Sequence, residues 1–236
     1  MVVLSLCDGM SCGRLAMERV GIPVEKYFAS EIKDVAIKVT MDNFPDTEEI
    51  GDVNKVFYED GVLHTEKGNY KTPIDIVFFG SPCQTFSAAM RSELRTGLEN
   101  KEKSGLFLEC CRVLKEVNPK YFLVENVASM RPGDKNFITE ALGVQPIRIN
   151  SSLVSAQLRD RYYWTNISGV TCPLDRGVEL QSILTRGYTD RKKARALLVS
   201  DSRPIKSKQK CLGDTRKQAL QRLFGTRRGT TKAYVT

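Results

Sequence analysis

The stretch IDIVFFGSPCQ, residues 74–84, joins a short apolar segment to a polar turn. Apart from Asp75, the side chains from Ile74 to Phe79 are apolar, which is typical of a strand buried on both faces. Gly80 ends the run, and Cys83 then stands between a proline and an amide. A thiol in this place could be a packing residue, a metal ligand or a nucleophile, and the rest of the chain has to distinguish them.

On both sides of this stretch, the first 166 residues alternate between strand patterns and helix patterns. The expected strands are 2–6, 26–30, 74–79, 121–124, 146–150 and 162–165, and the expected helices are 11–20, 34–43, 104–117 and 134–142. Helix 104–117 is the clearest, because its apolar residues recur at spacings of three and four, and Cys110 is interpreted as ordinary core on that face. The pattern predicts an α/β fold whose largely parallel sheet is covered by helices on both faces.

Length and composition predict a soluble, intracellular protein. The 236 residues suit one sizeable domain with a small appendage. No apolar run approaches the roughly 20 residues that span a bilayer, and the start MVVLSLCDGM lacks the basic segment of a signal peptide. The seven cysteines form no C-x-x-C pair and the only histidine is His64, so we expect no metal site and a reducing compartment.

Positive charge is concentrated in the C-terminal quarter. Residues 171–236 carry 16 Lys and Arg against 5 Asp and Glu, whereas the remaining residues carry 20 against 23. The alternation of strands and helices also fades there, leaving a strand pattern at 196–200 and a short helix pattern at 218–224, so we place a domain boundary near 170. The basic segment is interpreted either as a surface for a polyanion such as nucleic acid or as a solvated tail.

Polar residues follow several predicted strands, at the edge where open α/β sheets bind ligands. Asp8 and Gly9 open a glycine-containing turn after the first strand, and Glu31 follows the second strand 23 residues later. A carboxylate at that spacing can accept hydrogen bonds from a ribose diol, so the pair indicates a nucleoside-containing ligand. The ordinary alternatives are a plain turn and a carboxylate that caps the next helix.

Three further residues belong to the same predicted edge. Asp52 could accept a hydrogen bond from an adenine amine or could be a simple turn aspartate. Cys83 and Glu125 end neighbouring strands, where a nucleophile and a carboxylic acid can act on two atoms of one ring.

Taken in order, six segments resemble the DNA (cytosine-5)-methyltransferase family. They are CDGMSCG (7–13), SEIK (30–33), GDV (51–53), GSPCQTFS (80–87), LVENV (123–127) and QLRDRYYWTN (157–166). Pro82-Cys83-Gln84 matches the nucleophile motif of the family, Glu125-Asn126-Val127 its second catalytic motif, and Gln157-x-Arg159-x-Arg161 its Q-x-R-x-R motif. Because the matches span 2–166 in the family's order, they are far more specific than any one motif. Residues 125–166 look most like the eukaryotic de novo branch and its bacterial or phage relatives.

The resemblance implies a Rossmann-like methyltransferase fold and methylation of cytosine C5 in double-stranded DNA, with the target base flipped out of the helix. It implies that Cys83 attacks C6, that Glu125 acts on N3 and that Arg161 lies on the O2 edge. Arg159 is then expected to hold a backbone phosphate, and Asn126 to brace the turn before Cys83. Residues 85–103 are expected to form a loop that closes over the base, although a plain surface connection is the alternative.

S-adenosylmethionine is the cofactor that the resemblance implies. The residues expected to bind it are Leu6, Asp8, Gly9, Gly13, Glu31, Ile32, Asp52, Val53, Ser81 and Pro82. The resemblance also implies a place in bacterial or phage restriction-modification, and hence the cytoplasm of a bacterium or of an infected cell. It implies a catalytic domain at 1–170 and a partial target-recognition and C-terminal segment at 171–236.

The C-terminal part departs from the family. The family carries a Gly-Asn element on its last helix, and no Gly-Asn follows Arg161. The region after residue 166 is also shorter than the usual target-recognition region. The chain could therefore be a fragment, a minimal form, or one half of an enzyme completed by a missing segment or second subunit. Two other functions stay open, a transfer RNA cytosine-5 methyltransferase and an inactive DNA-binding homologue, whereas the absence of GxGxxG disfavours an NAD-binding protein.

Overall fold

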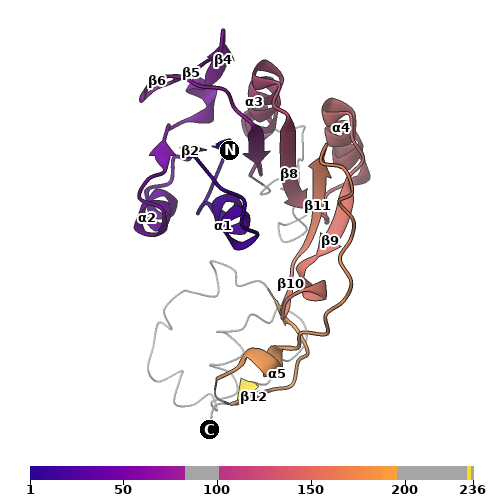
Figure 1. Ribbon diagram of the computed structural model, residues 1–236. Helices are drawn as coiled ribbons and strands as arrows, with labels where there is room; N and C mark the ends of the chain where they lie inside the picture. Colours follow the sequence, from indigo (N-terminus) through magenta and orange to yellow (C-terminus); the bar gives the residue numbers. More distant parts are fainter. Residues whose placement is uncertain (83–100, 186, 196–232, 235–236) are drawn as a thin grey trace, which may run out of the picture. The chain divides into compact units, whose positions relative to one another are not determined.

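A seven-stranded sheet, ordered β3-β2-β1-β7-β8-β11-β9, organises the chain (Figure 1). The computed structural model describes residues 1–82, 101–185, 187–195 and 233–234. The strands of the sheet are β1 (Val2–Leu6), β2 (Lys26–Ser30), β3 (Glu48–Glu49), β7 (Ile76–Phe79), β8 (Tyr121–Val127), β9 (Ile147–Asn150) and β11 (Asp160–Thr165). The five strands from β3 to β8 in this order pair in parallel, and β11 runs antiparallel to β8.

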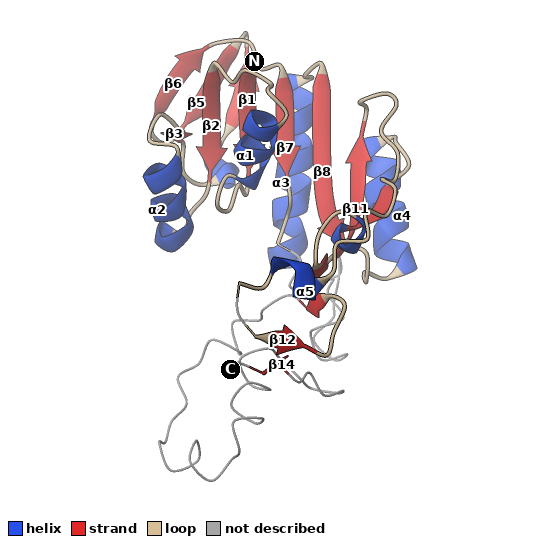
Figure 2. Ribbon diagram, turned by 60° about the horizontal axis from the view of Figure 1, so that its bottom comes forward, coloured by secondary structure: helices blue, strands red, loops and turns tan. Residues whose placement is uncertain are grey.

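Helices cover both faces of the sheet (Figure 2). They are α1 (Cys12–Arg19), α2 (Asp34–Asn43), α3 (Lys101–Val117) and α4 (Pro132–Leu142). Successive strand residues point to opposite faces. Leu4 accordingly packs in the large core cluster with Phe107 of α3 and Ile138 of α4, while Val3 packs in a smaller cluster with Met17 of α1. The predicted α/β fold with a mostly parallel, doubly covered sheet is confirmed.

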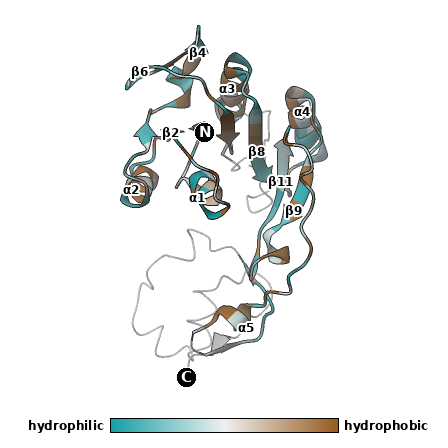
Figure 3. Ribbon diagram, in the orientation of Figure 1, coloured by the Kyte–Doolittle hydropathy of each residue, from teal (hydrophilic) through white to brown (hydrophobic). Residues whose placement is uncertain are grey.

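The central strands carry the apolar character that the sequence indicated. Val77 and Val124 are almost fully buried in the middle of β7 and β8. Figure 3 shows β8 as a hydrophobic segment that becomes hydrophilic toward its end, where Glu125 and Asn126 stand. The strand predicted at 121–124 therefore continues to Val127 and brings these two polar residues into the sheet.

A second sheet of three strands, formed by the part of the chain between β3 and β7, was not predicted. It consists of β4 (Phe57–Glu59), β5 (Val62–Thr65) and β6 (Gly68–Lys71), which form an antiparallel meander. The turn between β4 and β5 is Asp60-Gly61, and both residues have positive φ angles of 50° and 77°. An Asp-Gly pair between short strands is a hairpin signal, so the β4–β5 hairpin could have been predicted from the sequence.

The chain divides into two compact units. One consists of Met1–Arg148 with Arg161–Val170, and the other of Ile149–Asp160 with Thr171–Thr236. The remaining elements are short: η1 (Val53–Lys55), η5 (Ser151–Leu153), β10 (Gln157–Leu158), α5 (Leu180–Ile183), β12 (Tyr188–Thr189), β13 (Ala194–Arg195) and β14 (Ala233–Tyr234). The boundary near 170 and the roles given to its two sides stay predictions, and the strand expected at 196–200 and the helix expected at 218–224 lie outside the described residues. Across the described ranges, no helix is long and apolar enough to cross a membrane.

We predict that Gly13→Ala destabilises the fold whereas Gly105→Ala stabilises it. A Cβ on Gly13 of α1 would lie 2.9 Å from Cδ2 of Phe78, but a Cβ on Gly105 of α3 would meet no atom within 4 Å. The first change should lower the free energy of unfolding by about 1–3 kcal/mol through overpacking, and the second should raise it by about 0.5–1 kcal/mol because alanine favours the helix. Urea titrations of both variants test this, and an unchanged midpoint for Gly13→Ala would contradict the close contact.

Candidate active site

From β1 the strand order continues to β2 on one side and to β7 on the other, which is the kind of switch point at which open α/β sheets bind ligands. β1 pairs with β2 on one side and with β7 on the other, both in parallel. The connections that follow β1 and β7 therefore leave from neighbouring strand ends. They contain Cys7–Gly9 and Gly80–Pro82, which are two of the segments singled out from the sequence.

The loop after β1 is held by the carboxylate of Asp8. Tyr27 donates its hydroxyl to Oδ1 at 2.7 Å, and Ser11 donates to Oδ2 at 2.5 Å. Burial and the charge of Asp8 raise the pKa of Tyr27, so its hydroxyl keeps the proton that it donates. Cys7 and Ser11 both have a φ of 53°, which is uncommon for residues with a side chain. The structure thus gives Asp8 two internal partners, and its contact with a cofactor stays a prediction.

Glu31 joins the loop after β1 to the loop after β2. Its Oε2 accepts from the backbone N–H of Gly9 at 2.9 Å, and its Oε1 accepts from the N–H groups of Ile32 and Lys33 at 2.9 and 3.0 Å. The donors of the two latter bonds precede α2, and the N-cap residue Lys33 makes no side-chain cap hydrogen bond, so the helix-capping alternative is not confirmed. A carboxylate has about four acceptor sites, so Oε2 retains capacity for a hydroxyl of a ribose.

Asp52 stands at the start of η1, after β3. Its Oδ1 accepts from both the backbone N–H and the side-chain amide of Asn54, at 3.0 and 2.8 Å. Among the residues that the structure describes, no donor reaches its Oδ2. The turn itself depends on Gly51, whose φ is 82° and whose absent Cβ leaves room for the Glu66 carboxylate. Asp52 therefore serves the turn with one oxygen, and its contact with a cofactor stays a prediction.

The other residues expected at the cofactor differ in exposure. Leu6 and Val53 are buried in the large core cluster, whereas Ile32 is exposed. Gly13 lies against Phe78, so close packing of α1 on the sheet explains its lack of a side chain. Ser81 is buried and Pro82 half-buried after β7. Among all the residues expected to bind the cofactor, Gly9 and Glu31 are joined by a hydrogen bond.

Glu125 and Arg161 form an ion pair across β8 and β11. Arg161 Nε lies 2.5 Å from Glu125 Oε1, and both side chains are largely shielded from solvent. A Cβ built on Gly80 would lie 3.4 Å from Glu125 Oε2, so the carboxylate stands directly beside the turn that leads to Cys83. Two residues that were predicted to act on one base are thus neighbours, although 36 positions separate them in the chain.

Asn126 holds the same turn from the other side. Its amide Nδ2 donates to the hydroxyl of Ser81 at 3.2 Å and to the Ser81 carbonyl at 3.4 Å. Its Oδ1 accepts from the N–H of Val127 at 2.8 Å, which fixes the orientation of the amide. Both residues are buried, so the turn before Pro82 has a rigid support.

Three of the predicted features are not placed beside Glu125 and Asn126 by the described structure. Cys83 and residues 85–100 of the expected closing loop lie outside the described residues. Residues 101–103 of that loop belong to α3 instead. Arg159 is exposed and belongs to the second compact unit, where its backbone pairs with Ser151 and Asn150.

Glu49 is a residue that sequence reasoning missed. It lies on β3 opposite Ala29, and both of its carboxylate oxygens are buried with no hydrogen-bond partner among the described residues. Burial first, and then the charges of Asp8 and Glu31, raise its pKa to about 7. A glutamate beside Glu48 on a two-residue strand carries no periodic signal, so the sequence offered no means of finding it.

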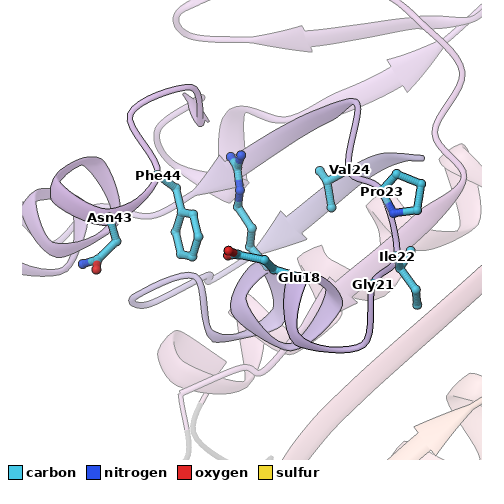
Figure 4. Close-up of a pocket in the computed structure, with 8 residues that line it drawn as sticks. Glu18, Gly21, Ile22, Pro23, Val24, Asn43 and Phe44 are labelled. Carbon is cyan, nitrogen blue, oxygen red and sulfur yellow. The ribbon is translucent and has the colours of Figure 1, made fainter.

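A separate depression lies between α1 and α2, with a volume of about 470 Å³ (Figure 4). Its lining residues are Arg14, Glu18, Gly21, Ile22, Pro23, Val24, Asn43 and Phe44. Residues 21–24 precede β2, so this depression is at the opposite end of the sheet from the carboxyl edge. Arg14 is committed to internal partners, because it donates to Thr47 at 2.8 Å and to Asp46 at 2.5 Å.

We predict that Glu49→Gln stabilises the fold above neutral pH but not in acid. Between the ordinary pKa of about 4.5 and the raised value of about 7, the folded chain keeps a proton that the unfolded chain loses. The free energy of unfolding should therefore fall as the pH rises through this window and stay low above it. After allowance for screening at this edge strand, the variant should gain about 1–2 kcal/mol at pH 8 and nothing near pH 4.

Urea titrations across this pH range measure the difference. The exposed Glu25→Gln is the matched control, since it removes one carboxylate of the same unit away from the sheet edge. If Glu49→Gln follows the pH profile of the unaltered chain, the carboxyl is not a buried, protonated group.

Comparisons with known proteins identify the family of this chain. The sequence pattern of the C-5 cytosine-specific DNA methylase family matches residues 1–143. The type II methyltransferase M.NgoBV of Neisseria gonorrhoeae is 33% identical over 144 residues, which are 59% of this chain and 31% of that protein. The orphan methyltransferase M.SPRI of Bacillus phage SPR is 31% identical over 174 residues, which are 68% of this chain and 36% of that protein. The chain thus spans about a third of the length of these relatives.

A solved structure adds independent support for the fold. It is described as a candidate DNA modification methyltransferase encoded within an Escherichia coli prophage, and it matches 80% of this chain and 57% of its own with a TM-score of 0.53 and 22% identity. The family match covers more than half of the described sequence, and it includes the loops after β1, β2, β3, β7 and β8. The chain therefore belongs to the C-5 cytosine-specific DNA methylase family.

Proposed function

We propose that this chain transfers a methyl group from S-adenosylmethionine to C5 of cytosine in double-stranded DNA, with Cys83 as the nucleophile. One observation carries the proposal. The Glu125–Arg161 ion pair stands beside Gly80, three residues before Cys83, and Asn126 holds the intervening Ser81. An acid, a guanidinium and a braced turn that leads to a thiol are the groups needed to activate a pyrimidine ring.

The residues of the chain would act on opposite sides of the ring. Cytosine C5 is a poor nucleophile, so the Cys83 thiolate forms a bond to C6 while the Glu125 carboxyl gives a proton or a hydrogen bond to N3. Electron density then moves to C5, which becomes an enamine carbon. After C5 has taken the methyl group, water takes the C5 proton, the electrons of that C–H bond form the C5–C6 double bond, and the S–C6 bond breaks so that Cys83 leaves as a thiolate. A proton given to N3 returns to Glu125 in the same stage. Arg161, held by Glu125, would stabilise charge on the ring during these steps.

The edge of the sheet suits an adenosine-containing cofactor. Bound there, S-adenosylmethionine would supply the methyl group from its sulfonium. Glu31 retains an acceptor site on Oε2 for a ribose hydroxyl, and Asp52 retains Oδ2 for an adenine amine. The N–H of Gly9 fixes the Glu31 carboxylate, so this acceptor is oriented before any ligand arrives.

DNA is the proposed partner, and the target base has to leave the duplex before groups on both sides of its ring can reach it. The excess of Lys and Arg in residues 171–236 supports a polyanionic substrate, because phosphate contacts supply most of the non-specific affinity for DNA. The relatives are about three times as long as the matched segment, so we include a further segment or second subunit that completes target recognition in this proposal.

We predict that Cys83→Ser abolishes methyl transfer and leaves cofactor affinity nearly unchanged. A serine hydroxyl has a similar shape but is almost fully protonated at neutral pH, so it cannot attack C6 as a thiolate does. Transfer of tritiated methyl groups to unmethylated phage DNA measures activity, with transfer RNA as the alternative substrate. Turnover by the variant above a few per cent of the unaltered chain would contradict the nucleophile, and methylation of transfer RNA alone would contradict the DNA substrate.

DNA that contains 5-fluorocytosine should trap the same bond. Fluorine at C5 cannot leave as a proton, so the S–C6 bond persists after methyl transfer. We expect a denaturation-resistant complex of chain and DNA that requires cofactor and is lost in Cys83→Ser. A complex that still forms in Cys83→Ser would assign the attack to another residue.

We predict that Glu31→Ala weakens S-adenosylmethionine binding more than it slows the chemical step at saturating cofactor. A charge-assisted hydrogen bond contributes roughly 1.5–3 kcal/mol, so the affinity should fall by about tenfold to a hundredfold. Calorimetry measures the affinity, with the exposed Asp42→Ala on α2 as the control. Equal affinities for Glu31→Ala and Asp42→Ala would rule out the ribose contact.

A further inference from the structure

Two thiols meet beneath the candidate cofactor loop. The Sγ atoms of Cys7, directly after β1, and Cys110, in α3, lie 4.0 Å apart. Cys110 is fully buried in the large core cluster, and Cys7 is half-buried and packs against the same cluster. Cys7 is therefore the more accessible residue of the pair, and Cys110 lies in the core.

Cys7 is also the first residue of the loop that contacts Glu31. Its φ of 53° is unfavourable for a residue with a side chain, and Asp8 and Gly9 follow it directly. The N–H of Asp8 donates to the Ser30 carbonyl at 3.1 Å, and the N–H of Gly9 donates to Glu31 at 2.9 Å. A displacement of the Cys7 backbone would thus be passed to the residues proposed to hold the ribose.

We propose that Cys7 and Cys110 form an oxidisable thiol pair, and that their disulfide lowers the affinity of the chain for S-adenosylmethionine. The affinity part rests on the proposed function, whereas the disulfide itself does not. The oxidant is a hydroperoxide. The thiolate of Cys7 attacks one oxygen of hydrogen peroxide and breaks the O–O bond, which gives a sulfenic acid and releases hydroxide. The thiol of Cys110 then attacks that sulfur, and the sulfenic oxygen leaves as water. Two thiols lose two electrons and two protons, and hydrogen peroxide becomes two molecules of water.

The surroundings of the two thiols shift their pKa values in opposite directions, and Cys7 is the one that favours the thiolate. The hydrogen bond from Cys110, aided by the positive charge of Lys33, lowers the pKa of Cys7 against the opposing effects of burial, Glu31 and Asp52. The same contact and complete burial raise the pKa of Cys110. The thiolate is the reactive form toward peroxide, so the half-exposed Cys7 is the thiol that is attacked first.

Closing the bond would displace the loop rather than the helix. A disulfide holds its sulfur atoms about 2.05 Å apart, so they must approach by roughly half of their present separation. α3 is fixed by Phe107 and Val113, which are fully buried on either side of Cys110. The loop at Cys7 has a strained backbone and is partly open to solvent, so it should take up most of the movement.

The test uses the full chain in a Cys83→Ser background, because peroxide would otherwise oxidise the proposed nucleophile. Trypsin places Cys7 and Cys12 in the peptide 1–14, and Cys110 and Cys111 in the peptide 104–112. After brief treatment with hydrogen peroxide, non-reducing peptide mapping should find these two peptides joined. The link should persist in Cys12→Ser and Cys111→Ser, and it should be lost in Cys7→Ser and Cys110→Ala.

Calorimetry with S-adenosylmethionine then tests the consequence. We expect oxidation to weaken binding by about tenfold, as for the loss of one charge-assisted hydrogen bond at this loop. Dithiothreitol should restore the affinity, and Cys110→Ala should bind equally before and after peroxide. No link between the two peptides, or a link with unchanged affinity, would overturn the proposal. If the reduced chain does not bind the cofactor at all, the proposed function fails, and peptide mapping still decides separately on the disulfide.

Discussion

The carboxylate of Glu31 is the contact on which the candidate site depends. It accepts the N–H of Gly9 from the loop after β1 and the N–H groups of Ile32 and Lys33 before α2. Parallel pairing of β1 with β2 brings the two loops to one edge, but it does not fix their conformations. A carboxylate that accepts from three backbone donors does restrict these conformations, because it ties N–H groups of both loops to one side chain. We propose the same carboxylate as the acceptor for a ribose, so that stability of the loops and recognition of the cofactor would come from one group.

The proposed chemistry lies on the other side of the same switch point. β7 separates β1 from β8, and its final turn is braced by Asn126 and flanked by Glu125 of β8. The antiparallel partner β11 contributes Arg161 to the ion pair. The residues proposed to bind the cofactor and those proposed to act on the base are thus separated by a single strand. A parallel sheet produces this arrangement directly, because its strand ends collect residues that are far apart in the sequence.

Sequence patterns predicted the elements that bury continuous apolar runs or amphipathic faces. β1, β2 and α2 appear at the expected residues, and Glu31 follows β2 as expected, whereas Glu125 lies within β8 because this strand continues to Val127. The sequence patterns could not predict contacts between residues of different helices and strands. Cys110 is indeed core, but periodicity says nothing about a thiol on another element 103 positions away. Glu49 was missed for a related reason, since its burial depends on how a two-residue edge strand pairs with β2.

A crystal structure of the chain with S-adenosylhomocysteine, the demethylated cofactor, would test the central claim most directly. The account predicts a ribose hydroxyl within hydrogen-bonding distance of Glu31 Oε2 and the adenine amine beside Asp52 Oδ2, with the Gly9 N–H still bound to Glu31. A nucleoside bound elsewhere, for example in the depression between α1 and α2 beside Phe44, would contradict it.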